Sequence, residues 1–225
     1  TSKIGNYAME FDGDGDFINV PYDPSLVITD GLTMESWVYP RAVTQFDYII
    51  SKGYISGSSP YIDYAMRFDS VTTQIRSAVT IGASQHQVVS SNLPLNDWTH
   101  VAMTYSDAEG LVSLYINGEL NNTTPASGIV DDSGTDIFIG MYEYNTNEAL
   151  DGYLDDVRIY NYAITEGEIL QHYNLGNIGE CTIDDDCNYL DSDYCSGTII
   201  FHDEGNCNID TCEVQSTLTN DCSLF

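Results

Sequence analysis

Three aspartates lie within one short turn near the start of the sequence, at Asp12, Asp14 and Asp16, and they alternate with glycine. Carboxylates held this close repel one another unless water or a cation neutralises them. Their hard oxygen atoms favour Ca²⁺ over transition metals. An EF-hand is a poor match, because Phe17 occupies the position that this loop reserves for glycine. Two interpretations therefore stay open, a calcium site and a turn of solvated acids.

Residues that could catalyse a reaction are sparse. The segment Glu10-Phe11-Asp12 is similar to the Glu-x-Asp core of sandwich glycosidases, but it lacks the second downstream glutamate that two-carboxylate hydrolysis requires. The sequence holds no GxSxG or HExxH motif, and we expect every cysteine to be oxidised. We therefore predict that the chain is not an enzyme, and a glycan-active hydrolase or lyase is the less favoured alternative.

Aromatic and amide side chains in two loops are candidates for glycan binding, since exposed rings stack on sugar faces and amides donate hydrogen bonds. The alternative is that these tyrosines serve protein contacts or core packing. The candidate ligand-binding residues are Tyr54, Tyr61, Tyr64, Tyr142, Tyr144 and Asn145.

The six cysteines all lie in the last fifth of the chain, with no CxxC pair among them. This pattern favours three disulfides over a zinc site, and 15 connectivities are possible. Oxidised cysteines indicate an extracellular protein, so we expect secretion with the signal peptide already removed. The glycosylation sequons at Asn121 and Asn122 fit such a protein. The disulfide candidates are Cys181, Cys187, Cys195, Cys207, Cys212 and Cys222.

The charge balance excludes several partners. The chain has 35 acidic and 6 basic residues, a formal net charge of −29, and only two lysines, Lys3 and Lys52. Nucleic acids and anionic membrane surfaces both require clusters of Lys and Arg, so neither is an expected partner. No apolar run is long enough to span a membrane. The acidity is compatible with adaptation to high salt.

The elements that must position these residues are predicted to be short strands. Alternating β-branched and aromatic residues predict strands over 71–81, 99–105, 111–116 and 137–144. Asn117-Gly118 predicts a tight hairpin turn. One helix is predicted over 165–173, where Thr165 and Glu168 form a capping box. Many strands and one late helix favour an all-β antiparallel sandwich. Trp37 and Trp98 are predicted to pack in its core between the sheets.

The cysteine boundary divides the chain into two predicted domains. Residues 1–177 have enough apolar residues for a sandwich core. Residues 178–225 hold few apolar residues besides the cysteines, so we expect a small disulfide-stapled module there.

Five segments, in this order, resemble laminin-G-like (concanavalin-A-like) jelly-roll domains, and together they extend over residues 8–175. They are 8–21, 32–40, 97–105, 112–120 and 154–165. The resemblance implies a jelly-roll β-sandwich and, most commonly, a non-catalytic carbohydrate-binding or adhesion module. The implied partner is a glycan or a cell-surface protein. The alternative is a structural subunit that self-associates into an extracellular filament, appendage or surface layer.

The resemblance also implies a structural Ca²⁺ that ties the first strand to the last. Its implied ligands are Asp12 and Asp16 on one side and Asp155 or Asp156 on the other. At most one of these adjacent aspartates would bind directly, because neighbouring residues of a strand point to opposite faces. Solvated turn acids with an ion pair to Arg158 are the alternative.

Overall fold

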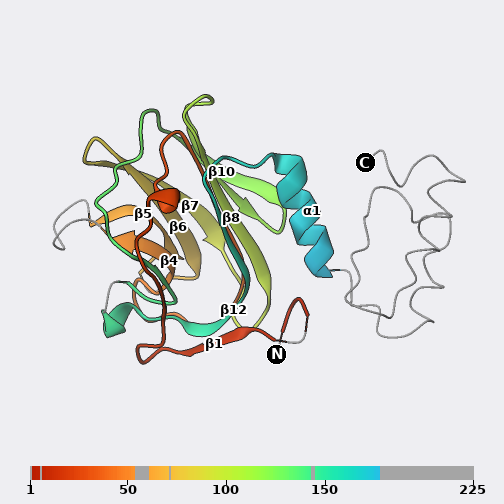
Figure 1. The fold of residues 1–225 in the computed structure, drawn as a ribbon. Coiled ribbons are helices and arrows are strands. Elements are labelled where there is room, and N and C mark those ends of the chain that lie inside the picture. Colours follow the sequence, from red (N-terminus) through yellow and green to blue (C-terminus); the bar gives the residue numbers. More distant parts are fainter. Residues whose placement is uncertain (1, 6, 54–60, 71, 143–144, 178–225) are drawn as a thin grey trace, which may run out of the picture. The chain divides into compact units, whose positions relative to one another are not determined.

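The protein is described here by a computed structural model that covers residues 2–5, 7–53, 61–70, 72–142 and 145–177. These residues form two antiparallel sheets of six strands each, packed face to face, and one helix (Figure 1). The predicted all-β jelly-roll sandwich is confirmed.

The sheets combine strands from distant parts of the chain. The first sheet contains, in spatial order, β1 (Met9–Asp12), β12 (Asp151–Tyr160), β3 (Gly31–Ala42), β8 (Thr99–Ser106), β9 (Leu111–Ile116) and β10 (Glu119–Pro125). The second sheet contains β2 (Ile18–Val20), β11 (Ile137–Ile139), β4 (Tyr48–Gly53), β5 (Ile62–Phe68), β6 (Gln74–Ile81) and β7 (Ser84–Asn92). Short 3-10 turns occur at Pro24–Leu26 and Thr146–Glu148.

Two sequence predictions about turns and strand ends have different outcomes. The predicted hairpin joins β9 to β10, and both Asn117 and Gly118 have positive φ angles, 53° and 78°. The strand predicted over 137–144 instead ends at Ile139. Gly140 follows with a φ of 86°, and a Cβ placed there would lie 2.1 Å from Cε1 of Phe11. The chain therefore leaves the sheet at a position that only glycine can occupy.

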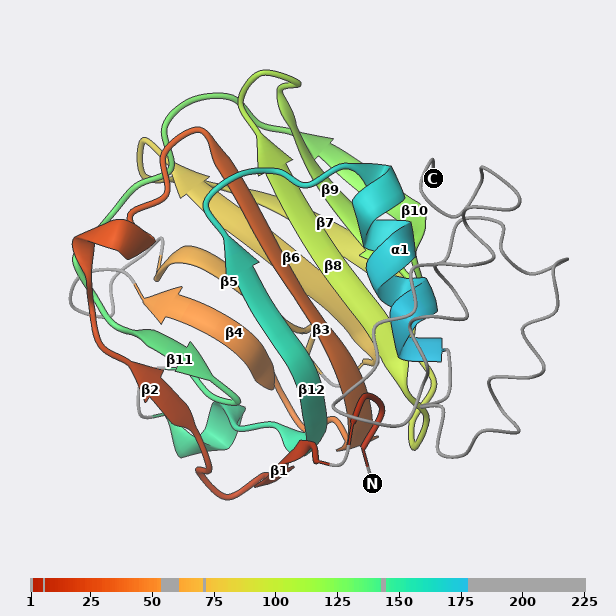
Figure 2. The same cartoon turned by 45° about the vertical axis from the view of Figure 1, so that its right-hand side comes forward.

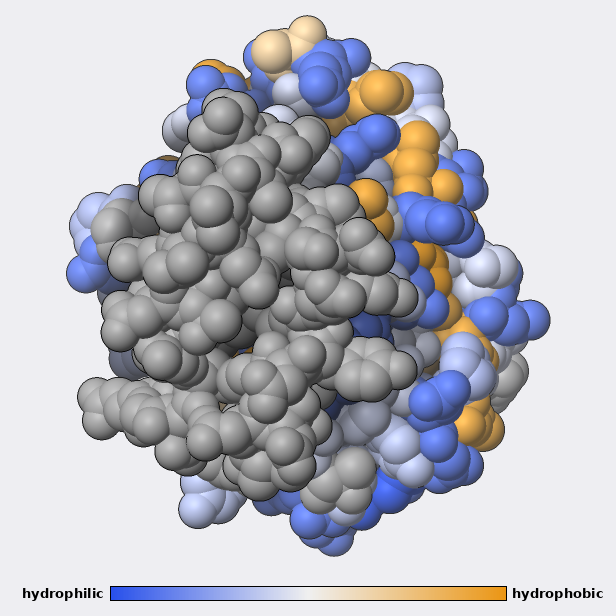
Figure 3. All heavy atoms as spheres, turned by 90° about the vertical axis from the view of Figure 1, so that its right-hand side faces the viewer, coloured by the Kyte–Doolittle hydropathy of each residue, from blue (hydrophilic) through white to orange (hydrophobic). Residues whose placement is uncertain are grey.

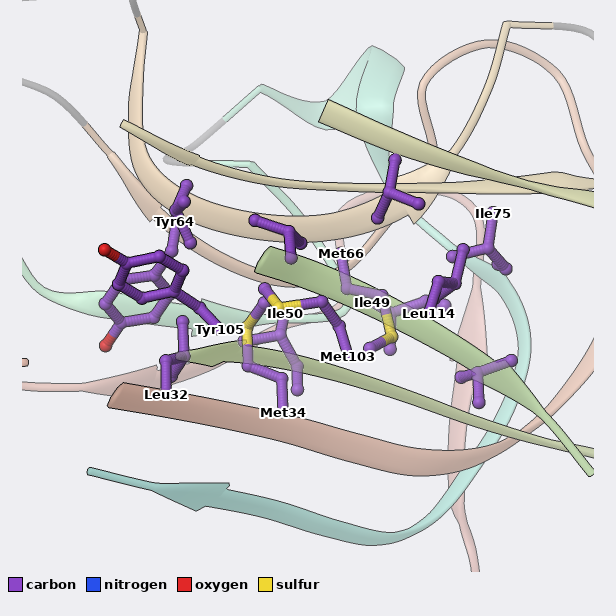
Figure 4. Close-up of a cluster of buried hydrophobic side chains, with 14 of the residues drawn as sticks. Leu32, Met34, Ile49, Ile50, Tyr64, Met66, Ile75, Met103, Tyr105 and Leu114 are labelled. Carbon is purple, nitrogen blue, oxygen red and sulfur yellow. The ribbon is translucent and has the colours of Figure 1, made fainter. Parts of the chain in front are cut away.

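The core lies between the two sheets, where branched, sulfur-containing and aromatic side chains interdigitate (Figure 4). Its labelled members are Leu32, Met34, Ile49, Ile50, Tyr64, Met66, Ile75, Met103, Tyr105 and Leu114. All ten are at most 1% exposed. A dry core of this size holds the two sheets in fixed positions and so fixes the surfaces that they present.

The tryptophans are not between the sheets, contrary to the prediction. Leu32, Met34 and Val38 of β3 face the core, so alternation places Trp37 on the outer face of the first sheet. There it is 1% exposed, with Nζ of Lys3 4.4 Å from its ring centre. Trp98 is half-buried, and its ring centre lies 5.5 Å from that of Tyr39.

The helix α1 (Glu166–Asn177) begins where the capping box was predicted. The Glu168 amide donates to Oγ1 of Thr165 at 3.2 Å, and the Thr165 amide donates to Oε2 of Glu168 at 2.7 Å. Ile169, on the first turns, packs with Ala102 of β8 and Tyr115 of β9. The start of α1 therefore covers part of the outer face of the first sheet, over β8 and β9 (Figure 2).

The described surface visible in Figure 3 is mostly hydrophilic, and its hydrophobic residues form a narrow band rather than a broad patch. No helix among the described residues is long and apolar enough to cross a membrane. All six cysteines, and with them the predicted module over 178–225, lie outside the described residues.

Candidate functional site

A groove of about 280 Å³ lies on the outer face of the second sheet. Its floor is low because two alanines occupy adjacent strands: Ala65 of β5 stands opposite Ala78 of β6. The larger neighbours on the same strands, such as Tyr64 and Met66, point the other way into the core. The groove is lined by Phe46, Tyr48, Tyr61, Ile62, Ala65, Arg67, Arg76, Ala78, Gln85, Gln87, Tyr142 and Glu148.

Aromatic rings form one wall of this groove. The ring centres of Tyr48 and Tyr142 lie 5.1 Å apart, and the Tyr142 hydroxyl donates to the carbonyl of Tyr61 at 2.8 Å. Phe46 precedes β4 on a loop that is held by Asp47, which accepts the Thr44 amide at 3.0 Å. The rings are thus fixed before any ligand arrives, which lowers the entropy lost on binding.

Arg76 and the two glutamines form a hydrogen-bonded wall on β6 and β7. Nε and Nη2 of Arg76 donate to the carboxylate of Asp69 at 3.0 and 2.7 Å. Nη1 of Arg76 donates to Oε1 of Gln87, whose Nε2 donates to Oε1 of Gln85 at 2.7 Å. Arg76 lowers the pKa of Asp69 through these hydrogen bonds. This side of the groove is therefore a rigid polar network.

The guanidinium of Arg67 makes few hydrogen bonds within the described residues, unlike that of Arg76. It donates to the carbonyl of Phe68 at 3.1 Å and lies 4.0 Å from Oδ1 of Asp69. Its carbon Cζ lies 4.2 Å from the ring centre of Phe46 and 5.5 Å from that of Tyr48. The side chain is only 18% exposed, and burial lowers the pKa of Arg67. Within the described residues, most of its N–H groups remain available to a ligand.

Glu148 is the carboxylate among the lining residues. Burial raises the pKa of Glu148, while the charge of Arg67 and a hydrogen bond from Asn145 oppose that change. Hydrolysis by the two-carboxylate route needs a pair of acids, and the described lining supplies one. The arrangement suits binding: rings can stack on apolar faces, and guanidinium and amide groups can hold oxygen atoms.

The predicted ligand-binding residues divide into three groups. Tyr61 and Tyr142 line the groove, and Asn145 caps the 3-10 turn that carries Glu148. Tyr64 was predicted wrongly, because its side chain points into the core and is 1% exposed, so it cannot stack on a sugar. Tyr54 and Tyr144 lie outside the described residues.

The sequence reasoning missed the charged part of the groove, Arg67 and Arg76. The signal was present, since apolar residues of β5 and β6 alternate with Ala65, Arg67, Arg76 and Ala78. A chain with four arginines that places two on the same sheet face concentrates positive charge there.

The predicted calcium ligands are not brought together as one set. Asp12 and Asp16 are adjacent: the Asp12 amide donates to Oδ2 of Asp16 at 3.3 Å, and the Asp14 amide donates to Oδ1 of Asp12 at 2.9 Å. Asp12 stands opposite Asp151 on β12. Asp155 is four residues further along that strand, which corresponds to about 13 Å. A single ion cannot bind the carboxylates of Asp12 and Asp155 across this distance.

The carboxylates of Asp155 and Asp156 on β12 already have hydrogen-bond or ion-pair partners. Oδ2 of Asp155 accepts the backbone amides of Lys3 and Ile4, each at 2.9 Å. Nε of Arg158 donates to Oδ1 of Asp156 at 2.9 Å, and Nη2 of Arg158 lies 2.6 Å from Oδ2 of Asp156. This is the ion pair that the alternative of solvated turn acids includes. No group of three or more Asp, Glu, His or Cys side chains in the described part of the chain is arranged to hold a metal ion. Asp155 and Asp156 therefore lie apart from Asp12 and Asp16 in this structure, and calcium binding stays a prediction.

An arginine connects the strands that the calcium ion was expected to connect. Arg41 of β3 donates to Glu10 at 2.6 Å and to the carbonyl of Phe11 at 2.7 Å, both on β1. Its Nε donates to Asp151 of β12 at 2.7 Å. The hydrogen bonds to Glu10 and Asp151 raise the pKa of Arg41. A guanidinium thus fastens the first strand to the last.

The predicted glycosylation sites are exposed residues of β10. Their side-chain amides are hydrogen-bonded to β7: Nδ2 of Asn121 donates to Oγ of Ser91 at 3.2 Å, and Nδ2 of Asn122 donates to the carbonyl of Val89 at 3.0 Å. Glycosylation of either residue stays a prediction.

Comparison with known families agrees with this fold. Residues 12–170 match a sequence model described as the concanavalin A-like lectin/glucanases superfamily. The chain belongs to this superfamily. The resemblance drawn from the five ordered segments is thereby confirmed, and the tail is not part of the match. A sequence search of curated proteins finds no match.

Solved structures of this superfamily's fold include several that are described as sugar-binding domains. The carbohydrate-binding module CBM40 of a Ruminococcus gnavus sialidase, bound to α2,3-sialyllactose, has a TM-score of 0.61 at 11% identity and covers 77% of this chain and 100% of its own. Domain 4 of an extracellular arabinanase from Geobacillus stearothermophilus, in complex with arabinotriose, has a TM-score of 0.54 at 18% identity and covers 72% of this chain and 74% of its own.

A putative carbohydrate-binding protein from Bacteroides ovatus has a TM-score of 0.58 at 20% identity over 72% of this chain. The match covers 45% of that protein, so this chain spans less than half of its length. At such low identities these likenesses concern the fold.

Proposed function

We propose that residues 1–177 form a non-catalytic carbohydrate-binding module of a secreted protein, and that the groove on the outer face of the second sheet binds the glycan. The observation that carries the proposal is the combination of fixed aromatic rings with hydrogen-bond donors in one groove. Membership of a lectin and glucanase superfamily and the likeness to sugar-binding domains support it. Secretion is supported by the cysteine-rich tail.

The groove favours a sugar that carries a negative charge. Arg67 is held in place by Phe46 and Tyr48, and most of its donors have no partner within the described residues. A guanidinium binds a carboxylate or sulfate through two parallel hydrogen bonds. The chain as a whole is strongly acidic, so an anionic polysaccharide would need a local cation such as Arg67 to bind.

Screening on a glycan array with neutral, carboxylated and sulfated members tests the proposal. We expect binding to acidic glycans, with affinity lost by a factor of about 10 or more in Arg67→Gln and Tyr142→Ala, since each removes a direct contact. Tyr162→Ala is the matched control, because Tyr162 is 52% exposed and lies outside the groove. Release of reducing ends from any polysaccharide would contradict the non-catalytic assignment.

Calcium stabilisation and self-association into a filament or layer stay predictions. For calcium, the proposal is carried by the turn in which Asp12 and Asp16 lie next to each other. Chelation should then lower the melting temperature by several degrees, as about 2.7 kcal/mol is gained at a hundredfold excess of ligand over its Kd. Asp12→Asn should remove that shift. An unchanged melting temperature after chelation would leave these residues as solvated acids.

A further inference from the structure

Lys52 is buried in an unusual environment. It is one of two lysines in the chain, and its side chain is 1% exposed on β4 of the second sheet. Its backbone neighbours are Tyr64 of β5 and Ile137 of β11. The ring centres of Tyr22 and Tyr64 lie 5.6 and 5.9 Å from its Nζ atom. Lysine is almost never fully buried, because an ammonium group in an apolar site loses its hydration.

Two carboxyl groups meet this amine. Nζ of Lys52 forms a hydrogen-bonded ion pair with Oδ1 of Asp132 and lies 3.2 Å from Oδ2 of Asp63. The Asp132 carboxyl is fixed on both sides, since Oδ1 accepts the Gly134 amide at 3.3 Å and Oδ2 accepts the Tyr22 hydroxyl at 3.4 Å. Nζ of Lys52 is therefore held against the carboxyl group of Asp132.

Asp63 has the properties of an acid that exchanges protons. It is fully buried, and its Oδ2 accepts the amide and the hydroxyl of Ser133 at 2.9 and 2.8 Å. Its Oδ1 has no hydrogen-bond partner in the described part of the chain. Burial raises the pKa of Asp63, although the bonds from Ser133 and Lys52 oppose the change. One ammonium and two carboxylates would leave an excess negative charge in this site, so the acid form of Asp63 is favoured.

We propose that Lys52 and Asp132 become joined by an intramolecular isopeptide bond, with Asp63 transferring the protons. The reactive forms are the neutral amine of Lys52 and the neutral acid of Asp132, which arise by proton transfer within the pair. Nζ of Lys52 then attacks the carboxyl carbon of Asp132. A C–N bond forms, the C–OH bond breaks, and one water molecule leaves. Asp63, in its acid form, gives a proton to the departing hydroxyl and then takes one from the nitrogen, so it is unchanged and no oxidant or cofactor is needed.

The location of the bond gives it a mechanical consequence. It connects β4 to the segment before β11, 80 residues apart in the sequence. Such a cross-link restricts the unfolded chain in the way that a disulfide does, but reducing agents do not break it. Asp132 is 24% exposed, so the released water has a path out of the site.

The mass of the reduced, full-length protein from a host without glycosylation tests the bond. We expect it to be lower than the sequence mass by one water molecule. Trypsin should fail to cleave after Lys52 and should yield peptide 42–67 covalently joined to peptide 77–158, because both peptides are then bounded by arginines. An unchanged mass would overturn the proposal. So would a loss of water that fragmentation assigns to an Asp-Gly pair such as Asp151-Gly152 instead of Lys52 and Asp132.

Two variants test the assigned roles. Lys52→Arg should keep the full sequence mass, because it has no primary amine. Asp63→Asn should also keep it and melt about 10 °C lower than the wild type. Complete bond formation in Asp63→Asn would overturn the role of Asp63. If neither variant folds, the branched peptide of the wild-type protein decides the proposal alone.

Discussion

At the scale of single residues, the groove depends on which side chains are charged. Glu148 and Arg67 share it, and their charges partly cancel. Because burial raises the pKa of Glu148, this carboxyl gains its proton at a higher pH than an ordinary glutamate. Below that pH the groove is more positive, and above it the negative charge returns.

The affinity for a sulfated glycan should therefore increase as the pH falls from 7 to 5. A sulfate stays charged over this range, so the change reports the protein. We expect an increase of roughly two- to fivefold, typical of one partly exposed charge. Glu148→Gln should bind more tightly at pH 7 and lose most of the pH dependence in isothermal titration calorimetry. An identical pH profile in the variant would exclude Glu148 as the titrating group.

Substitutions at two glycines test whether the close approach of Phe11 requires glycine where the chain leaves the second sheet. Gly140→Ala would put a Cβ 2.1 Å from the Phe11 ring, so it should reduce the free energy of unfolding by about 3 kcal/mol or more. Gly82→Ala is the control, because Gly82 also has a positive φ, 55°, but nothing lies within 4 Å of the added atom. Its cost should be about 1 kcal/mol, from the backbone alone. Equal costs in urea unfolding would contradict the packing argument.

At the scale of the elements, α1 depends on its capping box. Thr165→Ala removes the hydroxyl that accepts the Glu168 amide, and it should cost about 1 kcal/mol in urea unfolding. Thr165→Ser keeps the acceptor and should cost much less. A similar loss in both variants would mean that the methyl group, rather than the cap, is important.

The strands and the helix could be predicted where local patterns decide them. Asn117-Gly118 requires positive φ angles, and Thr165 with Glu168 satisfies the first turn of a helix, so neither depends on distant contacts. The end of β11 could not be predicted, because it depends on Phe11, far away in the sequence. The alternating pattern also could not predict on which face of the sheet Trp37 lies, because that depends on which side of β3 packs against the other sheet.

The candidate site was predictable only in part for the same reason. Tyr61 and Tyr142 lie in segments whose composition identifies them, and both line the groove. Tyr64 lies in the same segment as Tyr61 but within a strand, where the pleat directs it into the core. The position of Arg67 beside Phe46 depends on the pairing of β4 with β5, which one sequence does not reveal.

At the scale of the whole molecule, the net charge of −29 opposes compaction through self-repulsion. Salt screens this repulsion over a Debye length of about 10 Å at 0.1 M. The melting temperature should therefore rise between 0.05 and 0.5 M NaCl, on the order of several degrees, in scanning calorimetry. A melting temperature that falls with salt would mean that attractive ion pairs, such as those of Arg41, outweigh the repulsion.

The central claim is that the groove on the second sheet, rather than the other face of the sandwich, binds the ligand. A crystal structure with an acidic oligosaccharide selected on the glycan array tests it most directly. We predict that the sugar lies in the groove, with its carboxylate or sulfate on the guanidinium of Arg67 and a ring face against Tyr142. A sugar bound instead to the half-buried rings of Tyr39, Trp98 and Tyr153 on the first sheet would contradict the claim.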